Sequence, residues 1–385
     1  MLALPITAAV TLGATSVEMG ILNALGSAPA LIFGLFAGVW VDHHKRRLIL
    51  IGADIGRAVI LALIPLSALM GMLSVQVLYV VGFISGTLGL FFNVAYRSYL
   101  PGLVGRDQLV KANSRLELSN SIAEIIGPGV AGGMVQIIGA PIAIAVDAFT
   151  FLISAFSIGM IRTPETEIES SPTNTNLGRE IKDGLHHVFD EIRLRALAGC
   201  IGSLSLFNSI FEAVQILYLT RGLGLSAGWL GVIFASGSVG FLLGAVTTER
   251  VNRSIGLGRS LILGVLLTGC SDLLVPLAGR IHLQWLIIVL LILAQFFFGI
   301  GLTFFQIGQV SLRQSLTPNN LQGRMNATLS MLSWGIVPLG SLLGGVLGQV
   351  IGVSLTLAMA AVGEILSVLW LFFSPIRLIR QTGTV

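Results

Sequence analysis

Residues 283–312 read LQWLIIVLLILAQFFFGIGLTFFQIGQVSL, a stretch without charged side chains that is long enough to cross the hydrocarbon core as a helix. Similar stretches recur along the chain, which is 54% hydrophobic and 10% charged, with a mean hydropathy of +0.92. A soluble domain typically carries about 25% charged residues. Most of this chain therefore cannot face water, and we predict a multi-pass helical protein of the cell membrane.

Eleven stretches are predicted to span the bilayer, and residues 1–13 form a twelfth stretch that is too short to do so. The predicted spans are 17–41, 48–71, 75–97, 114–138, 140–161, 195–220, 226–248, 257–279, 283–312, 322–350 and 353–374.

Charge in the loops predicts the orientation. All but two of the 22 Lys and Arg residues fall on or near one side of the predicted membrane, the exceptions being Arg221 and Arg280. The positive-inside rule then places the connector between the halves and the C-terminus in the cytoplasm. Because the basic residues are spread over short loops, the net charge of +4 does not indicate a nucleic-acid partner.

The second part of the chain repeats the first. An offset of 213 residues aligns Gln136–Gly139 with Gln349–Gly352, and an offset of 211 aligns positions further upstream. Other matched positions are Phe91 to Asn93 with Phe304 to Gln306, Asn113 with Asn326, Gly127 with Gly340, Gly132 with Gly345, Gly26 with Gly237 and Gly13 with Gly224. Halves of equal orientation predict a parallel duplication about an axis along the membrane normal.

We therefore predict an all-α membrane protein with an N-terminal six-helix half at 1–162, a cytoplasmic connector at 163–192 and a C-terminal six-helix half at 193–385. The helix ending at Gly224 extends back to about Arg195, whereas its counterpart ending at Gly13 is much shorter. We expect the first helix to lack about 16 membrane residues, through an artificial or misassigned start or as a genuine short form.

The loop after the first long span resembles the signature G-x-x-x-D-R-x-G-R-R of the major facilitator superfamily. The matching residues are Gly38, Asp42, Arg46 and Arg47. The pairs Leu100-Pro101, Asn113-Ser114 and Gly127-Pro128 are similar to the bacterial exporter branch that includes enterobactin and macrolide efflux carriers. The resemblance covers essentially the whole chain and implies the major facilitator fold.

The resemblance also implies a cytoplasmic gate, because in the family the signature latches the two halves together while the outside is open. Asp42 would accept hydrogen bonds from a helix N-terminus, and Arg46 and Arg47 would pair with it or with lipid phosphates. The alternative is that the basic residues only anchor the topology.

A second motif predicts a hinge. Gly127, Pro128, Gly132 and Gly133 resemble the G-P-x-x-G-G signature of drug antiporters, with one extra residue before the glycine pair. Proline removes a backbone hydrogen bond and kinks a helix, and glycine allows a partner to approach closely. The same residues read as G-x-G-x-x-G, but no strand precedes them, which excludes a dinucleotide site.

Acidic residues inside spans are functional candidates because charge is costly there. In this fold the helices carrying Glu124 and Glu212 border the cavity, so we predict that these two couple transport to protons. Asp54 and Arg57 are expected to form a structural pair. Asp147, Asp272 and Glu364 fall on helices outside the cavity, where we expect them to hydrogen-bond between helices.

Amide and aromatic side chains would supply the remaining chemistry of the cavity, and they suit a bulky amphipathic solute. These predicted cavity residues are Asn93, Asn208, Phe211, Gln215, Phe304, Gln306 and Gln309.

Other classes of protein find little support. The pairs His43-His44 and His186-His187 lack further ligands at metal spacing, and Cys200 and Cys270 lie in apolar runs. No activated nucleophile or phosphate-binding loop is evident, so we predict no enzyme, metal or cofactor. We expect a monomeric proton-coupled exporter of a small amphipathic compound, such as a drug, macrolide or siderophore. The alternative is a receptor or scaffold with a degenerate carrier fold.

Overall fold

The computed structural model describes residues 3–104, 108–161, 186, 188–318 and 321–380, and a few helical side chains, including those of Asp42, Asn113 and Ser114, lie outside the described part. The described residues form helices and no strand. Eleven of these helices are long and apolar enough to cross a membrane, which confirms the predicted number of spans. Most of the predicted connector 163–192 lies outside the described residues.

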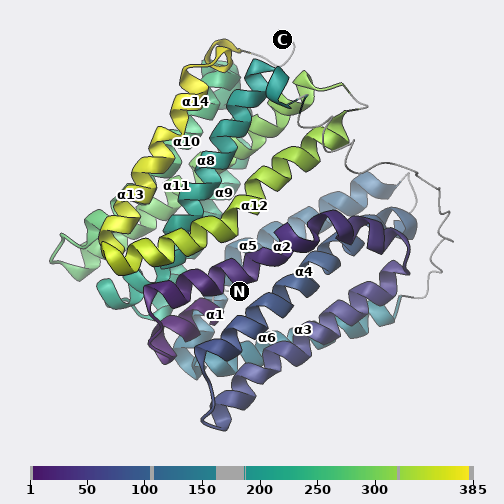
Figure 1. Cartoon of the computed structure of the whole chain (residues 1–385), viewed down its shortest axis with the longest axis vertical. Helices are drawn as coiled ribbons and strands as arrows, with labels where there is room; N and C mark the ends of the chain where they lie inside the picture. The colour runs from purple at the N-terminus through teal and green to yellow at the C-terminus, as the bar shows by residue number, and fades with distance from the viewer. Residues whose placement is uncertain (1–2, 105–107, 162–185, 187, 319–320, 381–385) are drawn as a thin grey trace.

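The first half begins with a short helical segment and continues with five long helices (Figure 1). Its elements are α1 (Ala3–Ile6), the π-helix η1 (Thr7–Thr11), α2 (Ser16–Asp42), α3 (Arg46–Leu69), α4 (Val75–Val104), α5 (Leu109–Ile138) and α6 (Ala140–Gly159).

The second half repeats this order with a longer opening helix. Its elements are α8 (Ile192–Leu217), the π-helix η3 (Tyr218–Gly222), α9 (Ala227–Ile255), α10 (Leu257–Ala278), α11 (Gln284–Leu316), α12 (Gln322–Val350), α13 (Val353–Leu366), α14 (Val368–Phe372) and the 3-10 helix η4 (Pro375–Leu378).

The repeat extends to the details of the backbone. The π-helices η1 and η3 lie 211 residues apart, and each is followed by a glycine with positive φ, at Gly13 (67°) and Gly224 (66°). The turns at Gly139 and Gly352 form a second pair of glycines with positive φ, 213 residues apart. Only glycine adopts this conformation without a steric cost, so the repeated glycines fix the same turns in both halves.

Side-chain capping fixes the start of α2. The Thr15 hydroxyl accepts a hydrogen bond from Glu18 N (3.3 Å), and the Glu18 carboxylate accepts one from Thr15 N (2.7 Å). This reciprocal arrangement satisfies amide groups that a helix terminus otherwise leaves unpaired.

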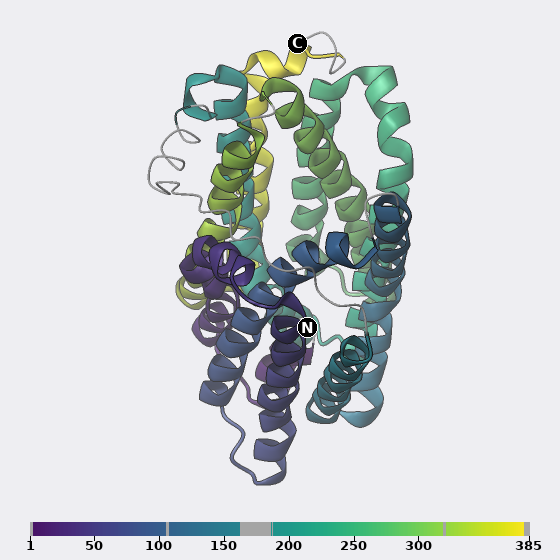
Figure 2. The ribbon, with the colours of Figure 1, turned by 90° about the vertical axis from the view of Figure 1, so that its right-hand side faces the viewer.

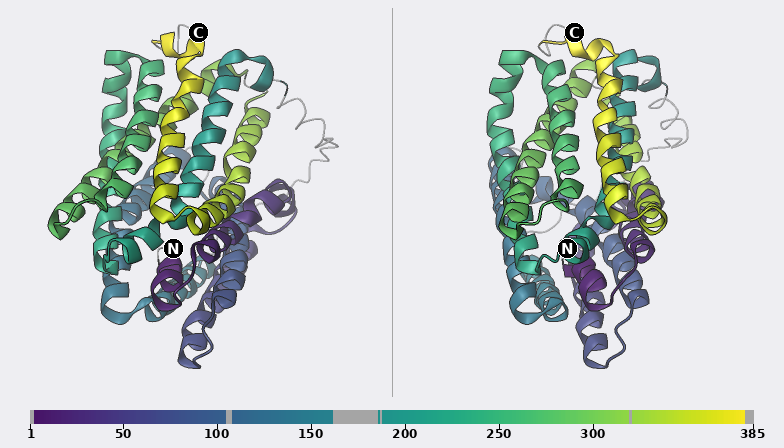
Figure 3. Two further views of the ribbon diagram at one scale, coloured as in Figure 1. Left: turned by 60° about the vertical axis from the view of Figure 1, so that its left-hand side comes forward. Right: turned by 90° about the vertical axis from the view of Figure 1, so that its left-hand side faces the viewer.

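The two halves meet at one side of the molecule and diverge toward the other (Figure 1). We call the side where α2 and α6 end and α8 begins the basic side, because nearly all the described Lys and Arg residues lie near it. We call the other side the opposite side. Most helix packing occurs within each half. The principal contacts between the halves are those of α2 with α12 and of α5 with α9. The side views show the purple and blue helices of the first half mostly below the green and yellow helices of the second (Figures 2 and 3).

Candidate functional site

The first of two close contacts between the halves is the crossing of α2 with α12. Gly20 lies against Gly345 so closely that a Cβ atom on Gly20 would fall 2.5 Å from Ser341 O and 2.8 Å from Gly345 Cα. Real side chains essentially never approach to this distance, so only glycine fits at the crossing. Both glycines lie near the opposite side, close to the start of α2 and the end of α12.

The second contact is the crossing of α5 with α9. A Cβ atom on Gly132 would fall 2.6 Å from Gly231 Cα, and one on Gly231 would fall 2.7 Å from Pro128 O. Of the predicted hinge residues, Pro128 and Gly132 therefore pack at the interface between the halves. Gly127 and Gly133 have open space where a side chain would stand.

The two crossings are related by the repeat. Gly132 corresponds to Gly345 at the offset of 213, and Gly20 corresponds to Gly231 at the offset of 211. Each crossing therefore joins one glycine of the first half to one glycine of the second, and the repeat exchanges the two crossings. A pseudo-twofold axis between the halves requires this arrangement. Gly20 and Gly231 were not selected from the sequence, although the repeat alignment would have paired them.

Arg221 adds a polar contact between the halves on the opposite side. Its guanidinium donates from Nε (3.1 Å) and Nη2 (2.6 Å) to Ala9 O, and from Nη1 (2.9 Å) to Ala14 O. These carbonyl groups lie at the end of the first helical segment, where backbone acceptors lack intrahelical partners. Arg221 thus ties η3 of the second half to the opening segment of the first.

Of the predicted gate residues on the basic side, Arg47 contacts α6 of its own half. Arg47 donates to the carbonyl groups of Ile158 (3.3 Å from Nε) and Gly159 at the end of α6. A cation is favourable there because the C-terminus of a helix is its negative end. Gly38 has open space around it, and the side chain of Asp42 lies outside the described residues.

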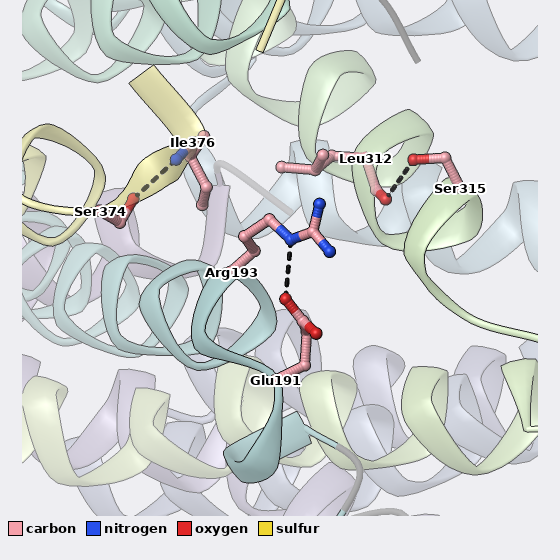
Figure 4. Close-up of polar contacts among 6 residues, drawn as sticks. All are labelled: Glu191, Arg193, Leu312, Ser315, Ser374 and Ile376. Carbon is pink, nitrogen blue, oxygen red and sulfur yellow. Dashed lines mark hydrogen bonds and ion pairs between the residues drawn. The ribbon is translucent and has the colours of Figure 1, made fainter. Parts of the chain in front are cut away.

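The basic end of the second half has its own polar contacts (Figure 4). Arg193 donates from Nε to Glu191 Oε1 (2.7 Å) just before α8, and its guanidinium points toward α11. A groove of about 510 Å³ lies nearby between α8 and α14, and none of the predicted cavity residues lines it.

The predicted cavity residues differ in exposure. Asn93 and Gln306 are accessible and Asn208 is half-buried, whereas Gln215 and Gln309 are buried. Phe211 and Phe304 are also buried, at 1% and 5% exposed, and Phe211 belongs to a core cluster that includes Ile6 and Val135 of the first half. Gln309 donates to Gln306 Oε1 (3.4 Å), which joins one buried amide to an accessible one.

The two acids predicted to couple protons are both accessible. Glu124 lies on α5, where its backbone carbonyl accepts a hydrogen bond from Ser238 Oγ (2.6 Å) of α9, close to the contact between the halves. Glu212 lies on α8 between the buried Phe211 and Ala213. It stands one helical turn after Asn208 on the same face of α8 and keeps accessible surface.

The remaining membrane charges form two groups. Arg57 Nη1 lies 3.7 Å from Asp54 Oδ1 and its guanidinium stacks over Phe92 and Phe151, which confirms the expected pair. Asp272 and Glu364 are buried next to each other, whereas Asp147 is exposed on α6.

Comparisons with known proteins agree with this arrangement. The family model of the Major Facilitator Superfamily matches residues 1–337. The chain is 25% identical over 347 residues to macrolide efflux protein A of Streptococcus pyogenes, covering 88% of this chain and 83% of the relative. It is 26% identical to the multidrug efflux pump Tap of Mycolicibacterium fortuitum (94% and 88% covered) and 24% identical to the enterobactin exporter EntS of Salmonella typhi (92% and 84% covered).

Solved structures share the fold. A bacterial homologue of the iron transporter ferroportin, in an inward-facing state, superposes with a TM-score of 0.70 at 15% identity, covering 96% of this chain and 94% of the other. The nucleoside transporter NupG superposes with a TM-score of 0.75 at 12% identity, covering 96% and 93%.

Proposed function

The chain belongs to the Major Facilitator Superfamily, and we propose that it is a secondary active transporter that exports a small amphipathic compound in exchange for protons. The efflux proteins among its relatives carry the proposal of export, since their names refer to macrolides, multiple drugs and enterobactin. A drug, a macrolide or a siderophore is therefore the proposed class of substrate.

The packing between the halves supports alternating access as the mechanism. The described close contacts between the halves lie on the opposite side or at mid-depth, at Gly20, Gly132 and Arg221. Transport would open these contacts and bring the halves together on the basic side, at the signature that includes Arg46 and Arg47. The halves 1–162 and 193–385 would move as units joined by the connector.

Orientation turns this cycle into export. With the basic side in the cytoplasm, as the loop charges predict, the diverging ends of the halves would admit substrate from the cytoplasm. Opening the glycine crossings would then release the substrate outside. The accessible amides Asn93 and Gln306 are the residues of the predicted cavity best placed to meet it in this conformation.

Glu212 and Glu124 are the proposed coupling acids. A carboxylate surrounded by protein at membrane depth is costly to keep charged, and protonation removes that cost. Exchange of a proton for substrate at such a group links the two fluxes. Glu212 carries the stronger case, because it keeps accessible surface and lies one turn along α8 from Asn208, which stands beside the buried Glu364.

The test is Glu212→Gln in inverted membrane vesicles that contain the full chain. We expect the variant to lose uptake of a labelled macrolide driven by a pH gradient, because the amide cannot bind and release a proton. Exchange of labelled for unlabelled macrolide without a gradient should persist. Glu249→Gln, at an exposed acid on the basic side, is the matched control. Unchanged gradient-driven uptake in Glu212→Gln would reject this residue as the coupling acid.

A further inference from the structure

Two acids lie buried together in the second half, away from the contact between the halves. Asp272 on α10 is 2% exposed and Glu364 on α13 is 0% exposed. Gly269 allows α10 and α13 to cross closely, because a Cβ atom there would fall 2.7 Å from Ile365 Cγ1 and 2.8 Å from Ile365 N. Asp272 lies three residues after Gly269, and Glu364 precedes Ile365, so the crossing brings the two carboxyl groups together.

A second close approach places α8 against the same acid. The ring of Phe207 fills the space where Gly363 would carry a side chain. The next residues on the two helices, Asn208 and Glu364, consequently lie beside each other. Glu364 is thus enclosed by Asp272 on one side and by the Asn208 amide on the other.

The carboxyl oxygen atoms remain short of partners. Glu364 Oε1, Glu364 Oε2 and Asp272 Oδ2 are buried, and none of them forms a hydrogen bond of ordinary geometry within the described chain. Buried polar groups are nearly always hydrogen-bonded, so each such atom requires an explanation. A proton held between two carboxyl groups supplies the donor that these oxygens lack.

Positive charge is distant from the pair. None of the ion pairs between described residues includes either acid. Apart from Glu364, α13 and α14 carry no charged residue, and the titratable groups at this depth on α8 and the following η3 are Glu212 and Tyr218. The charged residues of the neighbouring α9, α11 and α12 lie toward the basic side, at Glu249, Arg250, Arg253, Arg313 and Arg324.

The basic residues nearest to Asp272 along the chain are Arg259, at the start of α10, and Arg280, just beyond its end. Arg259 lies about 20 Å along the helix axis from Asp272, and Arg280 lies about 12 Å away, at 1.5 Å per residue. Two carboxylates side by side in a membrane, without a cation, cannot both stay ionised. No described group of three His, Cys, Asp or Glu residues lies close enough together to hold a metal ion, which favours a proton as the ligand.

We propose that Asp272 and Glu364 bind a shared proton at the crossing of α10 and α13 and exchange it with Glu212. In the exchange an O–H bond breaks at the pair, and one forms at the Glu212 carboxylate. Glu212 is the partner because it lies one turn after Asn208 on the same face of α8, next to the neighbour of Glu364, and keeps accessible surface. The role of this proton in transport rests on the proposed function, but its binding does not.

Infrared spectroscopy of the purified full chain in lipid tests proton binding without a substrate. We expect a carbonyl band from protonated carboxyl groups at neutral pH that disappears in the double variant Asp272→Asn/Glu364→Gln. Each single variant should shift the band, because one partner of the shared proton changes. Glu249→Gln, at an exposed acid paired with Arg253, is the control and should leave the band unchanged. A band that is the same in the double and single variants as in the parent chain would overturn the proposal.

Transfer into heavy water tests the exchange with Glu212. The band shifts when a deuteron replaces the proton, and we expect Glu212→Gln to slow this shift while Glu249→Gln does not. An unchanged rate in Glu212→Gln would overturn the route. Neither the carbonyl band nor its shift in heavy water depends on transport. Both results would therefore remain valid if the proposed export were disproved. A chain that exports by proton exchange but lacks the band would refute the buried pair alone.

Discussion

Arg221 is the residue whose side chain most directly joins the two halves. It stands where the first half has Val10 at the offset of 211, so the repeat supplies no second copy of this contact. Hydrogen bonds from a guanidinium to unpaired carbonyl groups contribute up to about 1.5–3 kcal/mol each, and less at an exposed site such as this one. Arg221 therefore stabilises the conformation that is closed on the opposite side.

We predict that Arg221→Gln shifts the population toward conformations open on the opposite side. The glutamine side chain is too short to donate to both Ala9 O and Ala14 O. The measurement is electron–electron double resonance between spin labels at Ile137→Cys and Ser226→Cys, in a background without Cys200 and Cys270. A longer distance component should appear. Arg280→Gln, on the same side, is the control, and equal distance distributions in both variants would contradict the prediction.

At the scale of the helix, the glycine crossings decide how close the halves can come. Gly132 and Gly133 form a natural pair for comparison, because a side chain on Gly132 would collide with Gly231, whereas one on Gly133 meets open space. Overpacking typically costs about 1–3 kcal/mol, which changes a conformational equilibrium by about 5–150-fold.

We predict that Gly132→Val prevents closure of the opposite side and abolishes efflux, while Gly133→Val leaves both nearly unchanged. Resistance of cells to a panel of macrolides measures efflux, and the Ile137–Ser226 label pair measures closure. Elution of both variants as folded protein in detergent separates a conformational effect from misfolding. Equal resistance with the two variants would show that the crossing does not limit the cycle.

The sequence predicted the helices well and their contacts poorly. A run such as 283–312 identifies a span by its length and apolarity, and α11 (Gln284–Leu316) confirms it. Whether a glycine faces another helix depends on the neighbouring element, so Gly20 and Gly132 look no different in sequence from Gly34 and Gly133. The proximity of Asp272 to Glu364 was missed for the same reason, since it arises from a crossing of helices far apart in the chain.

Only part of the candidate site could be predicted from the sequence, because the exposure of its side chains depends on the conformation of the protein. Glu212 was selected from its depth in a span and from the helix that carries it, both of which sequence can supply. The exposure of Phe211 or Gln309 depends on how the halves are placed, and one sequence must serve every state of the cycle. The role of the signature at Arg46 and Arg47 likewise stays a prediction, because in this conformation Arg47 binds the end of α6.

For the whole molecule, the loop charges predict that the basic side faces the cytoplasm. We expect a cysteine at Ser226, on the opposite side, to react with a membrane-impermeant maleimide in intact cells. A cysteine at Glu249, on the basic side, should react only after permeabilisation. Both positions are exposed, so orientation rather than burial decides the outcome. The reverse pattern would invert the direction of transport that we propose.

The measurement that tests proton-coupled export most directly uses the purified chain in liposomes with an imposed pH gradient. We predict that a labelled macrolide or siderophore accumulates on the side from which protons leave, and that a protonophore abolishes the accumulation. The same liposomes should show substrate-dependent proton movement in the opposite direction, recorded by a trapped pH-sensitive dye. Accumulation that is indifferent to the gradient, or no accumulation above empty liposomes across the substrate panel, would contradict the account.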